Sequence, residues 1–285
     1  MKLSIITINY NNKDGLEKTV ESVLCQSARE DFEYIIVDGA STDGGVEVLN
    51  KYGGECSRVI SEPDSGIYNA MNKGVRVAGG DYLLFLNSGD TLYSENTISV
   101  ILPKLTGDDL VIGRIMKIPG NVLSDSGMKL SLFHFIDKSL PHQATFIRRE
   151  LLLATPYDEK YRIVSDWKFF VQAVVLGNSS YRYIDDIISY YDCNGLSSMN
   201  RDESFVERDK VLQELFPERV LLDYRRFMDG QGYEDTTYDK FYIKLRDYKY
   251  GRVLYSLNVL ILKIVSLVMP GARFVRFFPG RLPQE

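Results

Sequence analysis

The chain has little cysteine and no excess of positive charge. Its three cysteines, Cys25, Cys56 and Cys193, stand far apart among 285 residues and form no CxxC pair. The spacing therefore indicates neither a zinc site nor a disulfide framework, and we expect a reducing compartment, the cytoplasm. The formal net charge of -5 argues against nucleic acid as a partner, because phosphate binding requires a basic surface. The apolar stretch in the opening MKLSIITINYNN is too short for a signal peptide.

Two common nucleotide-binding motifs are also missing. A dinucleotide site needs GxGxxG so that the backbone can approach the pyrophosphate, but the corresponding loop reads TINYNNKDG. The sequence has no GxxxxGK[ST] loop for a triphosphate either. Any bound nucleotide must therefore be held mainly by side chains and a cation.

The first ninety residues alternate between short β-branched runs and segments with helical apolar spacing. Such alternation at short intervals predicts an α/β fold with parallel strands and right-handed crossovers. The strands are expected over 3–8, 34–37, 58–61 and 82–86, and the helices over 13–27, from 46 onward and over 67–77.

Polar side chains follow each of these four expected strands. In an open parallel sheet, ligands bind beyond the carboxyl ends of the strands, so these residues would share one rim. The alternative is that the loops are polar only because they are exposed. The rim residues are Thr7, Asn9, Tyr10, Asp38, Ser41, Asp43, Glu62, Asp64, Ser65, Asn87 and Asp90.

Three motifs in this half carry a resemblance to a known family. IITINYNN, IIVDGASTDGG and SEPDSGIYNAMNKGVRVAGGDYLLFLNSGD resemble, in order and spacing, family 2 glycosyltransferases over roughly residues 1–200. The variant EPDSGIYNAMNKG is similar to bacterial enzymes of surface-polysaccharide assembly. The resemblance implies a GT-A-type, Rossmann-like mixed sheet flanked by helices. It also implies inverting transfer of a hexose or N-acetylhexosamine from a nucleotide-diphosphate sugar, a UDP-sugar, to a glycan or lipid-linked acceptor.

The resemblance also assigns expected roles to the rim. Thr7 and Asn9 would lie near the base and ribose, Tyr10 would contact the nucleotide-sugar, and Asp38 would accept a hydrogen bond from the base. The other expected donor contacts are Ser41, which would support the Asp38 loop, Asp64 on the nucleotide's other side, and Lys73, which either faces phosphate or is an ordinary exposed helix lysine.

The acidic motif of the family is reduced in this chain. Where the family usually has Asp-x-Asp, the sequence reads Asn87-Ser88-Gly89-Asp90. Asn87 and Ser88 would contact the donor, and only Asp90 offers a carboxylate to Mg²⁺ or Mn²⁺. Hard cations prefer oxygen ligands, and one carboxylate with an amide suffices only if the diphosphate completes the shell. The alternative is a plain turn, because Asn, Ser, Gly and Asp favour turns.

The second half supplies a candidate base. Strand 110–115, a loop over 117–130 and a helix around 150–153 are expected. His142 in PHQATF would face the diphosphate, the metal or the acceptor, or would be a structural histidine without a direct role. The family places its catalytic carboxylate at a helix start that Asp166 matches. A carboxylate there takes the proton of the acceptor hydroxyl. The alternative is a helix cap.

The remaining sequence predicts an appendage. Strands 181–188 and 189–191 with Asp185-Asp186 between them precede a loop, 194–198, in which Ser197, and beyond it Arg201, would contact the donor or stay at the surface. Residues 1–90 would bind the nucleotide, 91–200 the acceptor, and 201–285 would form a helical extension. The apolar run 253–269 has basic flanks, which suits a helix on the inner face of the plasma membrane. It suits a helix docked on the protein or in a homodimer interface equally well.

Two other functions stay open at this point. A sugar nucleotidyltransferase also joins a nucleotide half to a sugar half, but it needs a glycine-rich, basic first loop that TINYNNKDG does not supply. A non-catalytic sugar-nucleotide-binding or scaffold protein would explain the reduced acidic motif.

Overall fold

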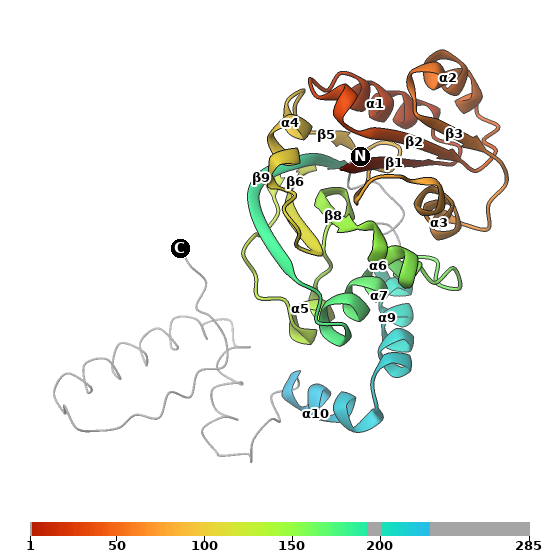
Figure 1. Cartoon of the computed structure of the whole chain (residues 1–285). Helices are drawn as coiled ribbons and strands as arrows, with labels where there is room; N and C mark the ends of the chain where they lie inside the picture. Colours follow the sequence, from red (N-terminus) through yellow and green to blue (C-terminus); the bar gives the residue numbers. More distant parts are fainter. Residues whose placement is uncertain (1, 193–200, 229–285) are drawn as a thin grey trace, which may run out of the picture. The chain divides into compact units, whose positions relative to one another are not determined.

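The computed structural model describes residues 2–192 and 201–228. The chain divides into two compact units, residues 1–215 and 216–285 (Figure 1). Helix α9 (Arg201–Leu215) belongs to the first unit, although the sequence prediction placed it in the extension. Within the second unit, the described residues form one helix, α10 (Glu218–Met228).

A mixed sheet forms the centre of the first unit. Among the described residues it has nine strands, in the order β3-β2-β1-β4-β8-β6-β9-β5, with β7 paired to β6. Strands β1 to β4 are parallel, as predicted, whereas β8 runs antiparallel to β4 and β6. The bounds are β1 Leu3–Asn9, β2 Glu33–Asp38, β3 Arg58–Ser61, β4 Tyr82–Phe85, β5 Thr91–Leu92, β6 Leu110–Ile118, β7 Val122–Leu123, β8 Thr145–Arg148 and β9 Tyr181–Asp192.

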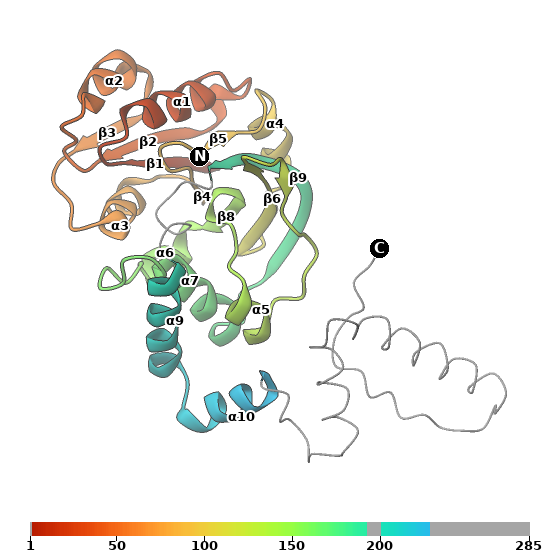
Figure 2. The ribbon, with the colours of Figure 1, turned by 180° about the vertical axis from the view of Figure 1, so that it is seen from behind.

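Helices cover both faces of the parallel half, α1 and α2 on one face and α3 on the other (Figures 1 and 2). The 3.6-residue spacing of Leu16, Val20 and Val23 places all three on the buried side of α1. The predicted mixed sheet flanked by helices is confirmed. The helices are α1 Lys13–Leu24, α2 Gly45–Tyr52, α3 Ile67–Val77, α4 Thr97–Ile101, α5 Leu132–Asp137, α6 Arg149–Ala154 and α7 Ser165–Phe170, which continues as a π-helical turn Val171–Leu176.

Strand β9 differs from the sequence prediction of two strands separated by Asp185-Asp186. It is continuous, and the pairing register with β6 shifts at a bulge near these two residues. Lys104 lies 2.6 Å from Asp186, and Arg114 lies 2.9 Å from Asp185. The bulge and these two cations accommodate adjacent carboxylates that in isolation favour a turn.

The predicted loop 117–130 is partly a hairpin, because β6 extends to Ile118 and β7 pairs back onto it.

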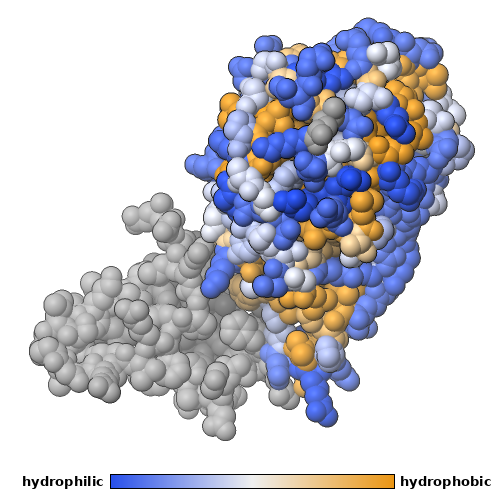
Figure 3. All heavy atoms as spheres, viewed as in Figure 1, coloured by the Kyte–Doolittle hydropathy of each residue, from blue (hydrophilic) through white to orange (hydrophobic). Residues whose placement is uncertain are grey.

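The predictions for Ser197, for the loop 194–198 and for the apolar run 253–269 lie outside the described residues, as does the side chain of Arg201. No helix within 2–192 and 201–228 has the length and apolarity needed to cross a membrane. Hydrophilic and apolar residues alternate over the face shown in Figure 3.

Candidate functional site

The polar rim predicted from the sequence is present at the ends of the parallel strands. Asn9, Asp38 and Ser61 end β1, β2 and β3 and are aligned in register across the sheet. The Asn9 amide donates to Asp38 Oδ1 at 2.7 Å, and the Ser61 hydroxyl donates to Asp38 Oδ2 at 2.8 Å. Parallel strands thus deliver these side chains to one edge, as the alternating pattern predicts.

The Asp38 carboxylate organises this rim. It is fully buried and also accepts two bonds from Ser41, from the backbone N–H at 3.0 Å and the hydroxyl at 2.5 Å. Burial alone would raise the pKa of Asp38, but the bonds from Ser41, Asn9 and Ser61 hold it below its ordinary value. The carboxylate is therefore ionised at neutral pH, and it fixes the loop after β2 against β1 and β3.

The side chains of Tyr10 and Asp64 both lie against Gly39, the residue after Asp38. A Cβ on Gly39 would lie 2.5 Å from Asp64 Oδ2 and 3.0 Å from the Tyr10 ring. A larger residue at this position would therefore displace the Asp64 carboxylate or the Tyr10 ring. Tyr10 is 66% exposed, so its ring is available to a ligand at the rim.

Two predicted donor contacts lie elsewhere. Thr7 is fully buried, and its hydroxyl lies 3.0 Å from the hydroxyl of Tyr34, so it sits behind the rim. The Lys73 ammonium donates to the carbonyl oxygen of Pro63 at 2.8 Å and pairs with Glu62 at 2.9 Å. These contacts tie Lys73 to the loop after β3, and a role in binding phosphate stays a prediction for it.

The loop Asn87–Asp90 follows β4 and is held by the start of α1. Asn12 donates to the backbone oxygen of Ser88 at 3.0 Å, and Gly89 N–H donates to the carbonyl of Gly15 at 3.1 Å. Gly89 has a φ of 107°, a conformation that L side chains rarely adopt. The glycine that replaces a carboxylate of the usual family motif is therefore needed for the path of this loop.

The oxygen ligands available to a cation at this loop are few. Asp90 is only 5% exposed, and Asn87 Oδ1 is a buried acceptor with no hydrogen bond from the protein. Within the described ranges no cluster of three histidine, cysteine or acidic side chains could hold a metal ion. The side chains therefore fit a hard cation only if a bound diphosphate supplies most of its ligands.

Asp166, in the first turn of α7, is the centre of a hydrogen-bond network that joins the two halves of the sheet. Its Oδ2 lies 3.1 Å from His142 Nδ1, and its Oδ1 lies 2.8 Å from the Tyr68 hydroxyl. Oδ1 also accepts the N–H of Trp167 at 2.8 Å. Asn87 Nδ2 lies 3.3 Å from His142 Nε2, which connects the network to the loop after β4. Three members of the network, Asn87, His142 and Asp166, were expected from the sequence, whereas Tyr68 was not.

The protonation states within this network follow from its donors. Because the Asn87 amide nitrogen donates to His142 Nε2, the proton of a neutral His142 lies on Nδ1 and points at Asp166. Burial would raise the pKa of Asp166, but His142, Tyr68 and the Trp167 N–H hold it below its ordinary value. Burial and the Asp166 carboxylate raise the pKa of Tyr68 well above its usual value, so its hydroxyl stays a donor. Asp166 is therefore an ionised acceptor at neutral pH.

Helix α3 contacts the segment that leads to Asp166 through two further residues that sequence analysis did not single out. Asn69 donates to Glu159 Oε2 at 2.8 Å, and Asn72 donates to Glu159 Oε1 at 2.8 Å. Asn72 also bonds the carbonyl and the N–H of Tyr157, at 2.9 and 3.0 Å. The YNAMN part of the third motif therefore faces residues 157–166, and the only sequence signal for this is the helical spacing of Tyr68 and Asn72 on one face.

Comparisons with known proteins identify the family of the chain. Residues 4–164, more than half of the chain, match the family model described as glycosyl transferase family 2. The chain belongs to this family. It is 31% identical over 232 residues to the PGL/p-HBAD biosynthesis glycosyltransferase of Mycobacterium tuberculosis. The aligned residues make up 79% of this chain and 90% of that protein. A second relative, the poly(ribitol-phosphate) beta-glucosyltransferase of Bacillus spizizenii, is 30% identical over 135 residues, 45% of this chain and 21% of that protein.

Solved structures share the fold of this family 2 chain. S. aureus TarS 1-349 in complex with UDP superposes with a TM-score of 0.58 at 20% identity, over 67% of this chain and 60% of that one. The glucosyl-3-phosphoglycerate synthase of Mycobacterium tuberculosis, in complex with Mn²⁺, UDP and phosphoglyceric acid, gives 0.54 at 16% identity, over 76% of this chain and 80% of that one. The predicted family, its glycosyltransferase activity and the GT-A-type fold are confirmed.

Proposed function

We propose that this glycosyltransferase transfers a sugar, with inversion at the anomeric carbon, from a nucleotide-diphosphate sugar to a cell-surface glycan or a lipid-linked acceptor. The observation that carries the proposal is the ionised Asp166 carboxylate, joined through His142 to the loop at Asn87. This chain of contacts links a candidate base to the place where the diphosphate is expected. Two relatives, named as a PGL/p-HBAD biosynthesis glycosyltransferase and a poly(ribitol-phosphate) beta-glucosyltransferase, support an acceptor in cell-surface biosynthesis.

In the proposed reaction, Asp166 acts as the general base. The oxygen of an acceptor hydroxyl attacks the anomeric carbon, the proton of that hydroxyl passes to Asp166, and the bond from the anomeric carbon to the diphosphate breaks. The nucleoside diphosphate leaves with the electron pair, so its leaving oxygen needs no proton. A single base is sufficient for this reaction, unlike glycoside hydrolysis, in which the leaving group must be protonated.

A divalent cation is part of the proposal. Asp90 and Asn87 Oδ1 would hold it together with the diphosphate, and Asn87 Oδ1 is a buried acceptor without a hydrogen bond from the protein. When bound, the cation neutralises charge that develops on the leaving diphosphate. Two solved neighbours are in complex with Mn²⁺, one together with UDP and the other together with GDP-Man. A UDP-sugar, the donor implied by the sequence, agrees with the UDP in TarS.

At the rim, the proposed nucleotide contacts are Tyr10, Asp64 and the loop that Asp38 organises with Asn9 and Ser41. Tyr10 offers an exposed ring, and Asp64 lies against Gly39 beside it. The cytoplasmic location, the membrane-surface helix and the homodimer stay predictions, because the helix lies in residues outside those described.

The function is tested by a panel of UDP-glucose, UDP-N-acetylglucosamine and GDP-mannose, each with and without MnCl₂. Thermal unfolding measures binding, and release of nucleoside diphosphate measures turnover. We expect one UDP-sugar to raise the melting temperature most strongly with Mn²⁺ and to be hydrolysed slowly. Binding without turnover, with any donor or added acceptor glycan, would instead support a scaffold protein.

A further inference from the structure

Helix α9 contacts the backbone that leads directly into the Asp166 helix. Glu207 Oε1 accepts the N–H of Arg162 at 2.9 Å. Its Oε2 accepts the N–H of Ile163 at 2.9 Å and that of Val164 at 3.2 Å. One carboxylate therefore satisfies three successive N–H groups immediately before α7 begins at Ser165.

The same segment is held from its other side by α3. The Tyr68 hydroxyl lies 2.7 Å from the carbonyl oxygen of Ile163 and 2.8 Å from Asp166 Oδ1, and its single proton is shared between them. The N–H groups of this segment thus contact α9, and one of its carbonyl groups contacts α3. These opposed contacts restrict where the backbone can place Asp166.

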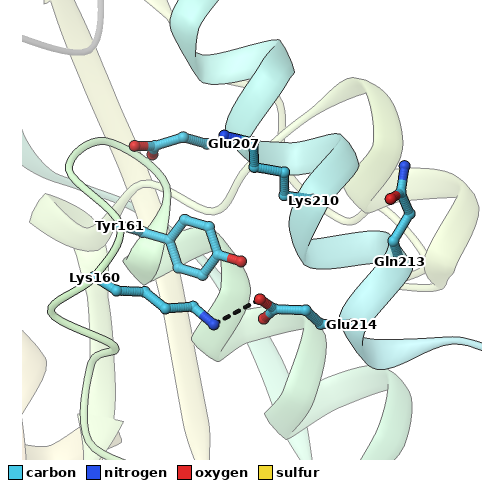
Figure 4. A pocket seen from close by; sticks show the side chains of 6 residues that line it. All are labelled: Lys160, Tyr161, Glu207, Lys210, Gln213 and Glu214. Atoms are coloured by element: carbon cyan, nitrogen blue, oxygen red, sulfur yellow. Dashed lines mark hydrogen bonds and ion pairs between the residues drawn. The ribbon is translucent and has the colours of Figure 1, made fainter.

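Other side chains fix α9 against the same region. Arg208 lies 5.0 Å above the ring of Trp167, the residue after Asp166. Glu214 accepts a hydrogen bond at 2.9 Å from Lys168, which is almost fully buried. Figure 4 shows Glu207 and Glu214 on α9 on either side of Tyr161, with Glu214 paired to Lys160.

We propose that Glu207 is a positioning residue for catalysis, and that α9 completes the active site by holding the backbone of residues 162–164 so that Asp166 faces the acceptor hydroxyl. This inference rests on the proposed function, in which Asp166 is the base. Glu207 lies beyond residues 4–164, which match the family model, so the contact comes from a part of the chain that the family match does not reach. A misplacement of about 1 Å can lower a rate on the order of 100-fold, so loss of this contact should affect turnover.

The experiment compares Glu207→Gln with Glu214→Gln, a matched removal of a carboxylate from the same helix. Turnover is nucleotide release, with MnCl₂, from whichever of UDP-glucose, UDP-N-acetylglucosamine and GDP-mannose the wild type hydrolyses fastest. For Glu207→Gln we expect kcat to fall about tenfold and KM to change less than about twofold. Hydrogen exchange of the peptide covering 162–170 should become faster. For Glu214→Gln we expect a lower melting temperature with wild-type kcat.

The outcomes separate this inference from the proposed function. If Asp166→Asn is inactive but Glu207→Gln keeps the kcat and the hydrogen exchange of the wild type, the positioning role is overturned and the proposed function stands. Equal loss of kcat in Glu207→Gln and Glu214→Gln would also overturn it, because α9 would then act only through general stability. Wild-type kcat in Asp166→Asn would instead refute the assigned base. If the wild type hydrolyses no donor, the proposed function fails, and unchanged exchange in Glu207→Gln would overturn the contact as well.

Discussion

Asp38 is fully buried and the Asp166 side chain is 16% exposed, and the pKa of both carboxylates is held below its ordinary value, but their partners come from different distances along the chain. Asp38 is bound by Asn9 and Ser61, which end the neighbouring parallel strands, and by Ser41 in the loop after its own strand. Asp166 is bound by its neighbour Trp167, by His142 and by Tyr68, which is 98 residues away in sequence. The first site is complete within the nucleotide half, whereas the second requires both halves to be in place.

This difference predicts different consequences of damage. A substitution in the Asp38 cluster should reduce stability and donor binding together, because the same hydrogen bonds stabilise the rim and determine its shape. A substitution around Asp166 should reduce turnover more than stability or donor binding, because the partners of Asp166 determine where one catalytic group lies. Four variants test this distinction, in order of decreasing expected effect.

The variant Asp38→Asn should destabilise the protein most. It replaces an acceptor oxygen with an NH₂ group that faces the donors of Asn9, Ser41 or Ser61 in a fully buried site. We expect the free energy of unfolding in urea to fall by about 2 kcal/mol, the cost of leaving a buried donor unsatisfied. Asp166→Asn should cost less, because the Asp166 side chain is 16% exposed to water. An equal or larger loss in Asp166→Asn would contradict the comparison.

The variant Asn87→Asp returns a carboxylate to the reduced acidic motif. It would place a second charged oxygen near Asp90 and beside His142. We expect the Mn²⁺ concentration for half-maximal donor hydrolysis to fall about tenfold, equivalent to ~1.4 kcal/mol. Ser88→Asp is the control that adds the same charge one residue along the loop. An unchanged Mn²⁺ requirement in Asn87→Asp would argue against a cation at this loop.

The variant Tyr68→Phe tests the long-range partner of Asp166. Removing the hydroxyl removes a hydrogen bond that lowers the pKa of Asp166, so that pKa should rise. The base works as a carboxylate and is lost as pH falls through its pKa, so the acidic limb of kcat should move to higher pH. Stability should fall by about 1 kcal/mol. An acidic limb that coincides with that of the wild type would show that Tyr68 does not act on the base.

The variant Glu214→Gln should have the smallest effect, and the effect should depend on pH. Hydrogen bonds from Lys160, Lys168 and Tyr161 lower the pKa of Glu214 to about 2. This stabilisation is complete above the unfolded pKa of about 4.3 and is lost as pH falls toward the folded value. Because Glu214 and Lys160 are partly exposed, we expect Glu214→Gln to lower the free energy of unfolding by less than about 1 kcal/mol at pH 7. In urea titrations this loss should shrink toward pH 3. A difference that grows toward acid would refute this assignment.

The sequence predicted the nucleotide half well because its signals are local. Strand β3 and helix α3 have the predicted bounds, Arg58–Ser61 and Ile67–Val77, and the strand-end residues Asn9 and Asp38 meet at one rim. Each strand, turn and helix there is encoded within about ten residues, and parallel topology then brings the ends together.

The remaining features depend on contacts that no local pattern records. The direction of Tyr68 is set by a segment far along the chain, and Glu207 acts from a helix that the predicted boundary at residue 200 excluded. Asp185-Asp186 looked like a turn because the pattern did not include Lys104 and Arg114, the cations that compensate the two carboxylates in strand β9. The sequence predicted either a phosphate contact or an exposed helix lysine at Lys73, but not its contacts with Glu62 and Pro63.

The proposed base is tested most directly by the turnover of Asp166→Asn compared with its donor affinity. We expect kcat for transfer or donor hydrolysis to fall on the order of 10²–10⁴-fold, because the general base is lost. Donor affinity, measured calorimetrically with MnCl₂, should stay within about twofold, because the rim around Asp38 is intact. Wild-type kcat in this variant, or loss of donor binding in step with kcat, would contradict the assignment of Asp166 as the catalytic base.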